Sequence, residues 1–167
     1  MSNTHHTRPD WIFLRRHPAH LLAFGFGAGL MPKAPGTWGT LVAFPFFALL
    51  LPYGANAVLA AALLFFVVGI WAADVTGRAV GVSDHGGIVI DEIAAFLLVL
   101  AFTPTGVAWW AVAFLLFRVF DIVKPWPISL ADRTIKGGFG VMFDDVLAAG
   151  YAIGVILLLR PISASLS

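Results

Sequence analysis

The sequence predicts an all-α membrane protein, a bundle of helices in which several members are short or re-entrant. Two observations carry this prediction. The 167 residues are 60% hydrophobic and 11% charged, with a mean hydropathy of +0.92, whereas soluble domains are about one quarter charged. The long aliphatic runs also lack the alternation of a membrane β-barrel. Because only helices and closed barrels satisfy backbone polar groups in lipid, a helical bundle remains.

Composition also excludes several functions. The chain has no cysteine, which rules out disulfides, thiolate metal sites and cysteine nucleophiles. A net charge of +1 argues against nucleic acid as a partner. We expect a polar N-terminal tail over residues 1–19, one membrane-embedded domain over residues 20–160, and a C-terminal tail over residues 161–167.

The first apolar region is predicted to be irregular. Residues 21–40 hold five glycines and two prolines, which rule out a regular helix for most of the segment. Irregular backbone at membrane depth is tolerated only where protein buries it or where it lines a wet cavity.

Five apolar runs follow, and most are too short for a simple span. A complete crossing needs about 20 residues, so the shorter runs either extend into their flanks or form hairpins that dip into the bilayer. Residues 41–51 pair with 56–73, and 93–102 pair with 107–117, so that each pair returns the chain to the side it left. A final helix is expected over residues 146–159.

This parity places the polar connections together. The N-terminal tail, residues 74–92 and residues 118–145 fall on one side with nine of the ten Lys and Arg residues, whereas the other side has only Arg160. The positive-inside bias therefore predicts that every charged connection lies in the cytoplasm.

Two of the predicted helices begin with paired carboxylates, Asp91-Glu92 and Asp144-Asp145. The simpler interpretation is helix capping, since acids favour helix N-termini. One acid would serve as a cap, however, and adjacent like charges beside lipid repel. Mg²⁺ relieves such repulsion by binding a few carboxylates together with waters and phosphate oxygens. We therefore predict a metal site on these four acids, the two pairs facing each other.

A further pair, Asp84-His85, is interpreted either as an ordinary loop or as a metal ligand beside a base. Arg118, Asp121 and Lys124 recur every three residues and so share one helix face. In one interpretation, the charged side chains on that face reach toward the membrane interface and form local salt bridges. In the other, the face binds an anion, with Asp121 as an added metal ligand.

Other groups suit a phosphate. Guanidinium and ammonium groups form charge-assisted hydrogen bonds with it, and such groups are present on Lys124, Arg133 and Lys136. Glycines 137, 138 and 140 could bring backbone N–H groups close to the same anion. The segment PKAPGTWGT (32–40) offers Lys33 and Thr37, and is interpreted either as a phosphate cradle or as a turn before a helix.

At these residues the sequence resembles the phosphatidylglycerophosphatase A family. The matching segments are HLLAFGFGAGLMPKAPGTWGT (20–40), GVSDHGGIVIDEIAAF (81–96) and RVFDIVKPWPISLADRTIKGGFGVMFDDVLAAG (118–150). The resemblance covers nearly the whole chain after about residue 17. It implies an all-helical, magnesium-dependent phosphatase of the bacterial inner membrane that converts phosphatidylglycerophosphate to phosphatidylglycerol.

The expected mechanism is Mg²⁺-assisted attack of water on the terminal phosphomonoester. The expected metal ligands are Asp91, Glu92, Asp144 and Asp145, with Asp84 and Asp121 as additional candidates. One of the acids, or His85, would deprotonate the water. The substrate phosphates would be held by Lys33, Thr37, Arg118, Lys124, Arg133 and Lys136. The expected partners are the lipid substrate and the bilayer, and a homo-oligomer is compatible with the sequence.

Two alternatives belong to other classes. A small ion-coupled transporter subunit would also place acids in the membrane and break helices with glycine. Against it, the charges gather at one face rather than at the midplane. A non-catalytic lipid-binding scaffold would leave the doubled acids unexplained.

Overall fold

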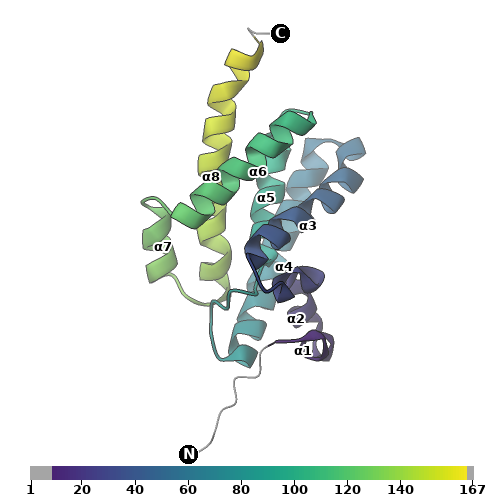
Figure 1. Ribbon diagram of the computed structural model, residues 1–167, viewed down its shortest axis with the longest axis vertical. Helices are drawn as coiled ribbons and strands as arrows, with labels where there is room; N and C mark the ends of the chain where they lie inside the picture. The colour runs from purple at the N-terminus through teal and green to yellow at the C-terminus, as the bar shows by residue number, and fades with distance from the viewer. Residues whose placement is uncertain (1–8, 165–167) are drawn as a thin grey trace, which may run out of the picture.

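The computed structural model describes residues 9–164, with side chains to residue 161. Within that range the chain is a bundle of helices without a strand, as predicted. The bundle is elongated: the turns at residues 51–54 and 103–106 lie at the same end as the end of the last helix, and the loop at 81–89 lies toward the opposite end (Figure 1). This arrangement agrees with the parity of the apolar runs.

The described part of the chain begins with two short helices, α1 (Trp11–Arg16) and α2 (Pro18–Ala23). The Asp10 carboxylate caps α1 by accepting a hydrogen bond from the backbone N–H of Phe13 at 2.8 Å. Leu14 and Ala19 are fully buried, and α2 packs against α4. The described part of the predicted polar tail is therefore folded against the bundle.

Residues 24–34 contain no α-helix, as the glycines and prolines there predicted. The 3₁₀ segment η1 (Gly25–Leu30) includes left-handed backbone at Phe26. The irregular region is shorter than expected, however, because α3 (Pro35–Leu50) starts with proline in its first turn, the position at which proline is tolerated in a helix. PGTWGT is thus the start of a helix and not a loop.

A hairpin follows, in which the 3₁₀ turn η2 (Leu51–Tyr53) joins α3 to α4 (Ala55–Val80). Beyond the loop at 81–89, α5 (Ile90–Phe102) and α6 (Val107–Val123) form a second hairpin. The short helix α5 packs against α3, α4, α6 and α8, and most of its side chains are buried. It is thus the central helix of the bundle, although its 13 residues are too few to cross a bilayer.

The charged stretch 118–145 is not a single connection. Helix α6 runs to Val123, α7 occupies Ile128–Thr134, and α8 begins at Gly137 and ends at Ala164. Asp144 and Asp145 therefore lie two turns inside α8, and the expectation that they begin a helix is wrong. The glycines allow close packing instead, since a side chain at Gly138 would overlap the carbonyl oxygen of Ile70 in α4.

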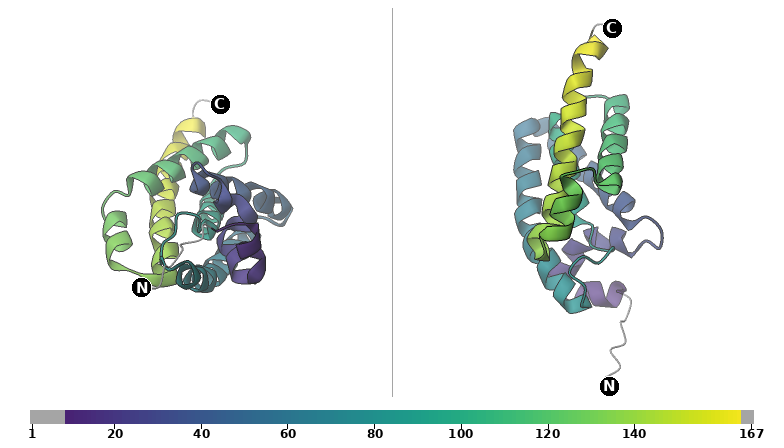
Figure 2. Two further views of the ribbon diagram at one scale, coloured as in Figure 1. Left: turned by 60° about the horizontal axis from the view of Figure 1, so that its bottom comes forward. Right: turned by 90° about the vertical axis from the view of Figure 1, so that its left-hand side faces the viewer.

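Helix α8 runs along the bundle between α4 and α6 (Figure 2). From the middle of α8, the Tyr151 hydroxyl donates a 2.8 Å hydrogen bond to the Trp126 carbonyl, which ties the α6–α7 connection to α8.

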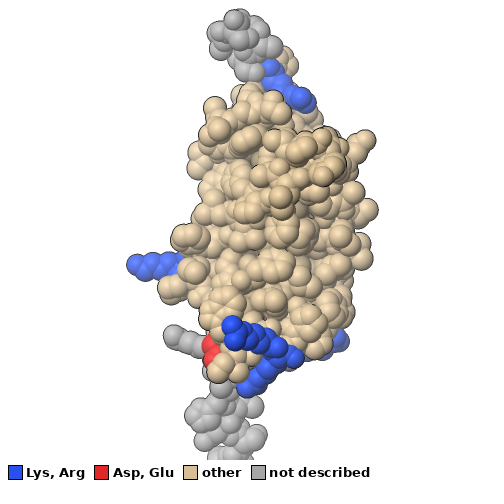
Figure 3. Space-filling view, turned by 90° about the vertical axis from the view of Figure 1, so that its right-hand side faces the viewer, with Lys and Arg blue, Asp and Glu red and all other residues tan. Residues whose placement is uncertain are grey.

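Three described segments are long and apolar enough to cross a membrane: Pro35–Tyr53, Ala55–Val80 and Gly137–Pro161. On the face shown in Figure 3, a broad band without charged side chains lies between basic side chains near the lower end and another at the top, and one further basic side chain projects from its left edge. The surface therefore has the band that a lipid-embedded protein requires.

Candidate functional site

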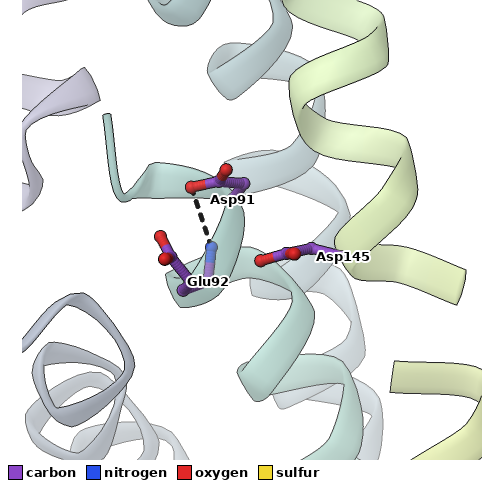
Figure 4. Close-up of side chains that lie close together, drawn as sticks. All are labelled: Asp91, Glu92 and Asp145. Carbon is purple, nitrogen blue, oxygen red and sulfur yellow. Dashed lines mark hydrogen bonds between the residues drawn. The ribbon is translucent and has the colours of Figure 1, made fainter. Parts of the chain in front are cut away.

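Three carboxylates meet near the polar end of the central helix. Asp91 and Glu92 lie in the first turn of α5, and Asp145 extends from α8 toward Glu92 (Figure 4). One oxygen from each residue can be chosen so that all three lie within 4.8 Å of one another. The two acidic pairs therefore meet as predicted, and Asp145 is the member of the second pair that makes the contact.

The oxygens of this three-acid cluster are poorly satisfied by protein. Asp91 Oδ1 accepts a hydrogen bond from the Glu92 backbone N–H at 3.1 Å. Glu92 Oε2 and Asp145 Oδ2 are buried and have no hydrogen-bond partner among the described residues. Buried acceptors without partners are costly, and neighbouring carboxylates disfavour one another's charge. A divalent cation would remove both costs, and all-oxygen ligands suit Mg²⁺ or Ca²⁺. The cluster thus fits a metal ion.

A partly buried arginine, Arg118, lies on the other side of Glu92. Arg118 Nη1 lies 2.5 Å from Asp121 Oδ2 and 3.6 Å from Glu92 Oε1. The same nitrogen donates to Thr40 Oγ1 at 3.4 Å, and Thr40 donates to the Gly36 carbonyl at 2.8 Å. Arg118 thereby links α6 to α5 and to the first turns of α3.

The close approach of α3 explains a glycine that the sequence analysis did not single out. A Cβ atom at Gly36 would overlap Glu92 Oε1 and come within 3.1 Å of Arg118 Nη1. The backbone of PGTWGT therefore borders the three-acid cluster. Thr37 is in the same first turn. The sequence feature that could have indicated this close approach is a glycine directly after a proline at the start of a helix.

Asp144 belongs to a second group, although it adjoins Asp145. Lys124 Nζ donates to Asp132 Oδ1 at 2.8 Å and also contacts Asp144 Oδ2. Burial alone would lower the pKa of Lys124, but the hydrogen bonds to Asp132 and Asp144 outweigh it and raise the pKa. The hydrogen bond from Lys124 lowers the pKa of Asp132. We call Lys124, Asp132 and Asp144 the lysine bridge.

A cavity of about 20 Å³ borders the lysine bridge, and Asp84, Lys136 and Gly140 contribute to its lining. Lys136 Nζ donates to the Asp132 carbonyl at 2.8 Å. Asp84 therefore lies beside Asp144, in the second group and not in the three-acid cluster.

The remaining predicted residues lie around these two groups. His85 is in the loop before α5, where its Nδ1 accepts a hydrogen bond from the Gly87 N–H at 3.0 Å and its ring contacts Phe24. Burial lowers the pKa of His85, against the smaller opposing effect of Asp84. Lys33 and Arg133 are exposed, at the start of the PKAPGTWGT segment and on α7.

Known proteins resemble this chain over most of its length. The sequence model of the family described as phosphatidylglycerophosphatase A matches residues 21–160. A phosphatidylglycerophosphatase A from Haemophilus influenzae is 44% identical over 146 residues, which cover 86% of this chain and 90% of that protein. One from Escherichia coli is 41% identical over 143 residues, with 84% and 82% covered.

A third relative, from Bacteroides thetaiotaomicron, is named provisionally as a phosphatidylinositol-3-phosphatase. It is 43% identical over 148 residues, which cover 84% of this chain and 92% of that protein. No solved structure matches this chain significantly.

Proposed function

This chain belongs to the phosphatidylglycerophosphatase A family, and we propose that it hydrolyses the terminal phosphomonoester of phosphatidylglycerophosphate to phosphatidylglycerol and inorganic phosphate. The observation that carries the proposal is the cluster of Asp91, Glu92 and Asp145, with buried unpartnered oxygens beside the partly buried Arg118. Phosphomonoester hydrolysis is among the slowest uncatalysed reactions, so it needs such a concentration of charge.

Mg²⁺ is the proposed metal, held by Asp91, Glu92 and Asp145. When bound, it supplies Lewis-acid stabilisation of the charge on the phosphoryl oxygens. Asp144 and Asp84 would support this site from the second group, because the lysine bridge neutralises Asp144 and leaves Asp145 to turn toward α5.

Arg118 is the proposed phosphate ligand inside the site. Its Nη1 is held by Asp121 and Glu92, while its Nε is buried without a hydrogen-bond partner among the described residues. A guanidinium held in this way can donate to a phosphoryl oxygen without reorganising. Outside the site, the substrate headgroup would meet the basic side chains of Lys33, Lys124, Arg133 and Lys136, with Thr37 at the start of α3.

The reaction forms a bond from the water oxygen to phosphorus and breaks the bond from phosphorus to the glycerol oxygen, which leaves with a proton. A carboxylate beside the phosphate, with Asp121 as a candidate, would accept the proton of the water. His85 is a weaker candidate. Its Nδ1 already accepts a hydrogen bond from Gly87, so in the neutral ring the proton lies on Nε2.

The site is proposed to face the cytoplasm from a bacterial inner membrane. Support comes from the sequence, in which nine of the ten Lys and Arg residues lie on the side of the acidic connections. In this orientation the acids reach a lipid phosphate at the membrane surface, and the acyl chains stay in the bilayer.

The test is phosphate release from phosphatidylglycerophosphate in detergent, with Mg²⁺ or with EDTA. We expect release with Mg²⁺ and none with EDTA. Full activity in EDTA would contradict the metal assignment. Cation flux into proteoliposomes without any phosphate release would favour the transporter alternative.

A further inference from the structure

An apolar groove opens between α4, α5 and α8. Its volume is about 360 Å³, and its lining includes Leu59, Leu63, Phe66, Ala94, Leu98 and Val146. Small-molecule sites in proteins usually have volumes of about 300–1,000 Å³ and predominantly apolar walls. The groove is thus large enough to hold a ligand, and every lining side chain is apolar.

The groove begins beside the three-acid cluster. Ala94 and Leu98 follow Asp91 by three and seven residues, so all three lie on one face of α5. Val146 directly follows Asp145 on α8. At a rise of 1.5 Å per residue, Leu98 is about 10 Å along the helix from Asp91. The groove therefore runs from the acids toward the far end of the bundle.

Close packing limits the groove at the level of the acids. A side chain at Gly69 of α4 would overlap Met142 of α8 and touch Ile90 of α5, and Met142 and Ile90 are fully buried. The three helices thus pack tightly one turn before Ala94. Farther along, Leu63 is 63% exposed at the rim, on a segment apolar enough to cross a membrane. The groove therefore opens to the surface that would face lipid.

We propose that this groove binds one acyl chain of the lipid whose phosphomonoester lies at Asp91, Glu92 and Asp145. The inference rests on the proposed function, and it names how the substrate is positioned. A free phosphomonoester would have no use for an apolar groove of this volume. A lipid could enter it sideways from the bilayer while its headgroup stays at the acids.

The groove should act mainly on orientation. Lipid tails in the bilayer are as apolar as the groove, so an acyl chain gains packing but little hydrophobic driving force on entering it. Holding the chain instead restricts where the headgroup can lie, and small displacements of a reacting group are costly in rate.

The test is a matched pair of substitutions on α4. Leu63→Trp places a large ring at the rim of the groove, whereas Leu64→Trp alters a neighbouring residue that is outside the lining and 62% exposed. Phosphate release would be measured in detergent with Mg²⁺ on long-chain phosphatidylglycerophosphate and on a short-chain, water-soluble analogue.

We expect Leu63→Trp to lower kcat/KM for the long-chain lipid by roughly tenfold, the scale of one lost methylene contact in an apolar pocket. Its activity on the short-chain analogue should stay at the level of the unmodified protein, and Leu64→Trp should match that protein on both. Equal effects of the two substitutions, or an equal loss on both substrates, would overturn the inference.

A second measurement does not depend on turnover or on either variant. The probe is a non-hydrolysable phosphonate analogue of phosphatidylglycerophosphate that carries a photoreactive diazirine at the end of one acyl chain, bound to the unmodified protein with Mg²⁺. We expect labelling concentrated on residues 59–66 and 94–98. Labelling spread evenly over the lipid-facing surface would overturn the proposal that the groove binds an acyl chain. If the unmodified protein releases no phosphate from either substrate, the proposed function would be overturned instead.

Discussion

Asp145 of α8 points at Glu92 of α5, and both carboxylates carry a buried oxygen that no described residue satisfies (Figure 4). With Asp91 they form one group whose selected oxygens lie within 4.8 Å of one another. Burying such a group of carboxylates costs folding free energy unless a positive charge binds to it.

Asp145→Asn should abolish most of the activity and leave the fold intact. The substitution removes one charge from the three-acid cluster but keeps the size of the side chain. We expect kcat to fall by roughly 100-fold or more, the usual scale for losing one preorganised electrostatic group, and more Mg²⁺ to be needed for half-maximal activity. Phosphate release measured over a Mg²⁺ titration checks this, and an unchanged titration would contradict it.

Gly36→Ala should damage the site although alanine favours helices. In an unconstrained helix the substitution would stabilise by about 1 kcal/mol. Here the added Cβ would overlap Glu92 Oε1, so we expect a loss of phosphate release. Gly154→Ala in α8 is the matched control, because a Cβ there meets nothing within 4 Å. It should keep full activity and equal or higher thermal stability.

Lys124→Met should destabilise the fold, because it leaves Asp144 buried without its partner. Breaking a buried pair costs roughly 3 kcal/mol, and Asp144 is almost fully buried. The exposed pair of Arg78 and Asp74, at 2.8 Å, provides the control. Arg78→Met should change the free energy of unfolding by less than about 1 kcal/mol. Denaturant unfolding of both variants would compare them, and equal effects would contradict the role of the lysine bridge.

The lysine bridge also predicts a pH window for stability. The pKa of Asp132 is lowered in the folded protein. The stability that its ionised carboxylate contributes is therefore complete above about pH 4, the ordinary pKa of an aspartate, and is lost as the pH falls through the lowered pKa. The raised pKa of Lys124 means that its stabilisation is complete below about pH 10 and is lost as the pH rises further. Asp132→Asn should therefore cost the same stability at pH 6 and pH 8, and a cost that changes between them would contradict the bridge.

His85→Asn should retain activity within about tenfold, since loss of a general base usually costs 100-fold or more. The asparagine oxygen can still accept the hydrogen bond that the Gly87 N–H gives to His85 Nδ1. The pH profile of phosphate release should also keep its shape. A missing acidic limb in the variant would instead identify His85 as the base.

Most of the helical architecture was predictable from the chain. The apolar runs at 56–73, 93–102, 107–117 and 146–159 lie inside observed helices, and the run at 41–51 lies inside α3 except for Leu51, which begins η2. The helix boundaries were less predictable. The glycines at 36, 39, 138 and 140 suggested loops, yet each lies in a helix, because close contacts with other parts of the chain favour a residue without a side chain. A single sequence does not distinguish a glycine needed for a turn from one needed for close packing.

The sequence by itself determined that the protein is a helical membrane protein, that its charges gather on one side, and that Asp91-Glu92 and Asp144-Asp145 are the acids to consider. Only the tertiary structure decided that Asp144 and Asp145 belong to two different groups of side chains. Successive residues on a helix point about 100° apart, so Asp145 turns toward α5 while Asp144 turns toward Lys124. Which of the two meets Asp91 depends on the rotation of α8 about its own axis. That rotation is set by contacts such as Gly138 against Ile70, between residues far apart in the chain.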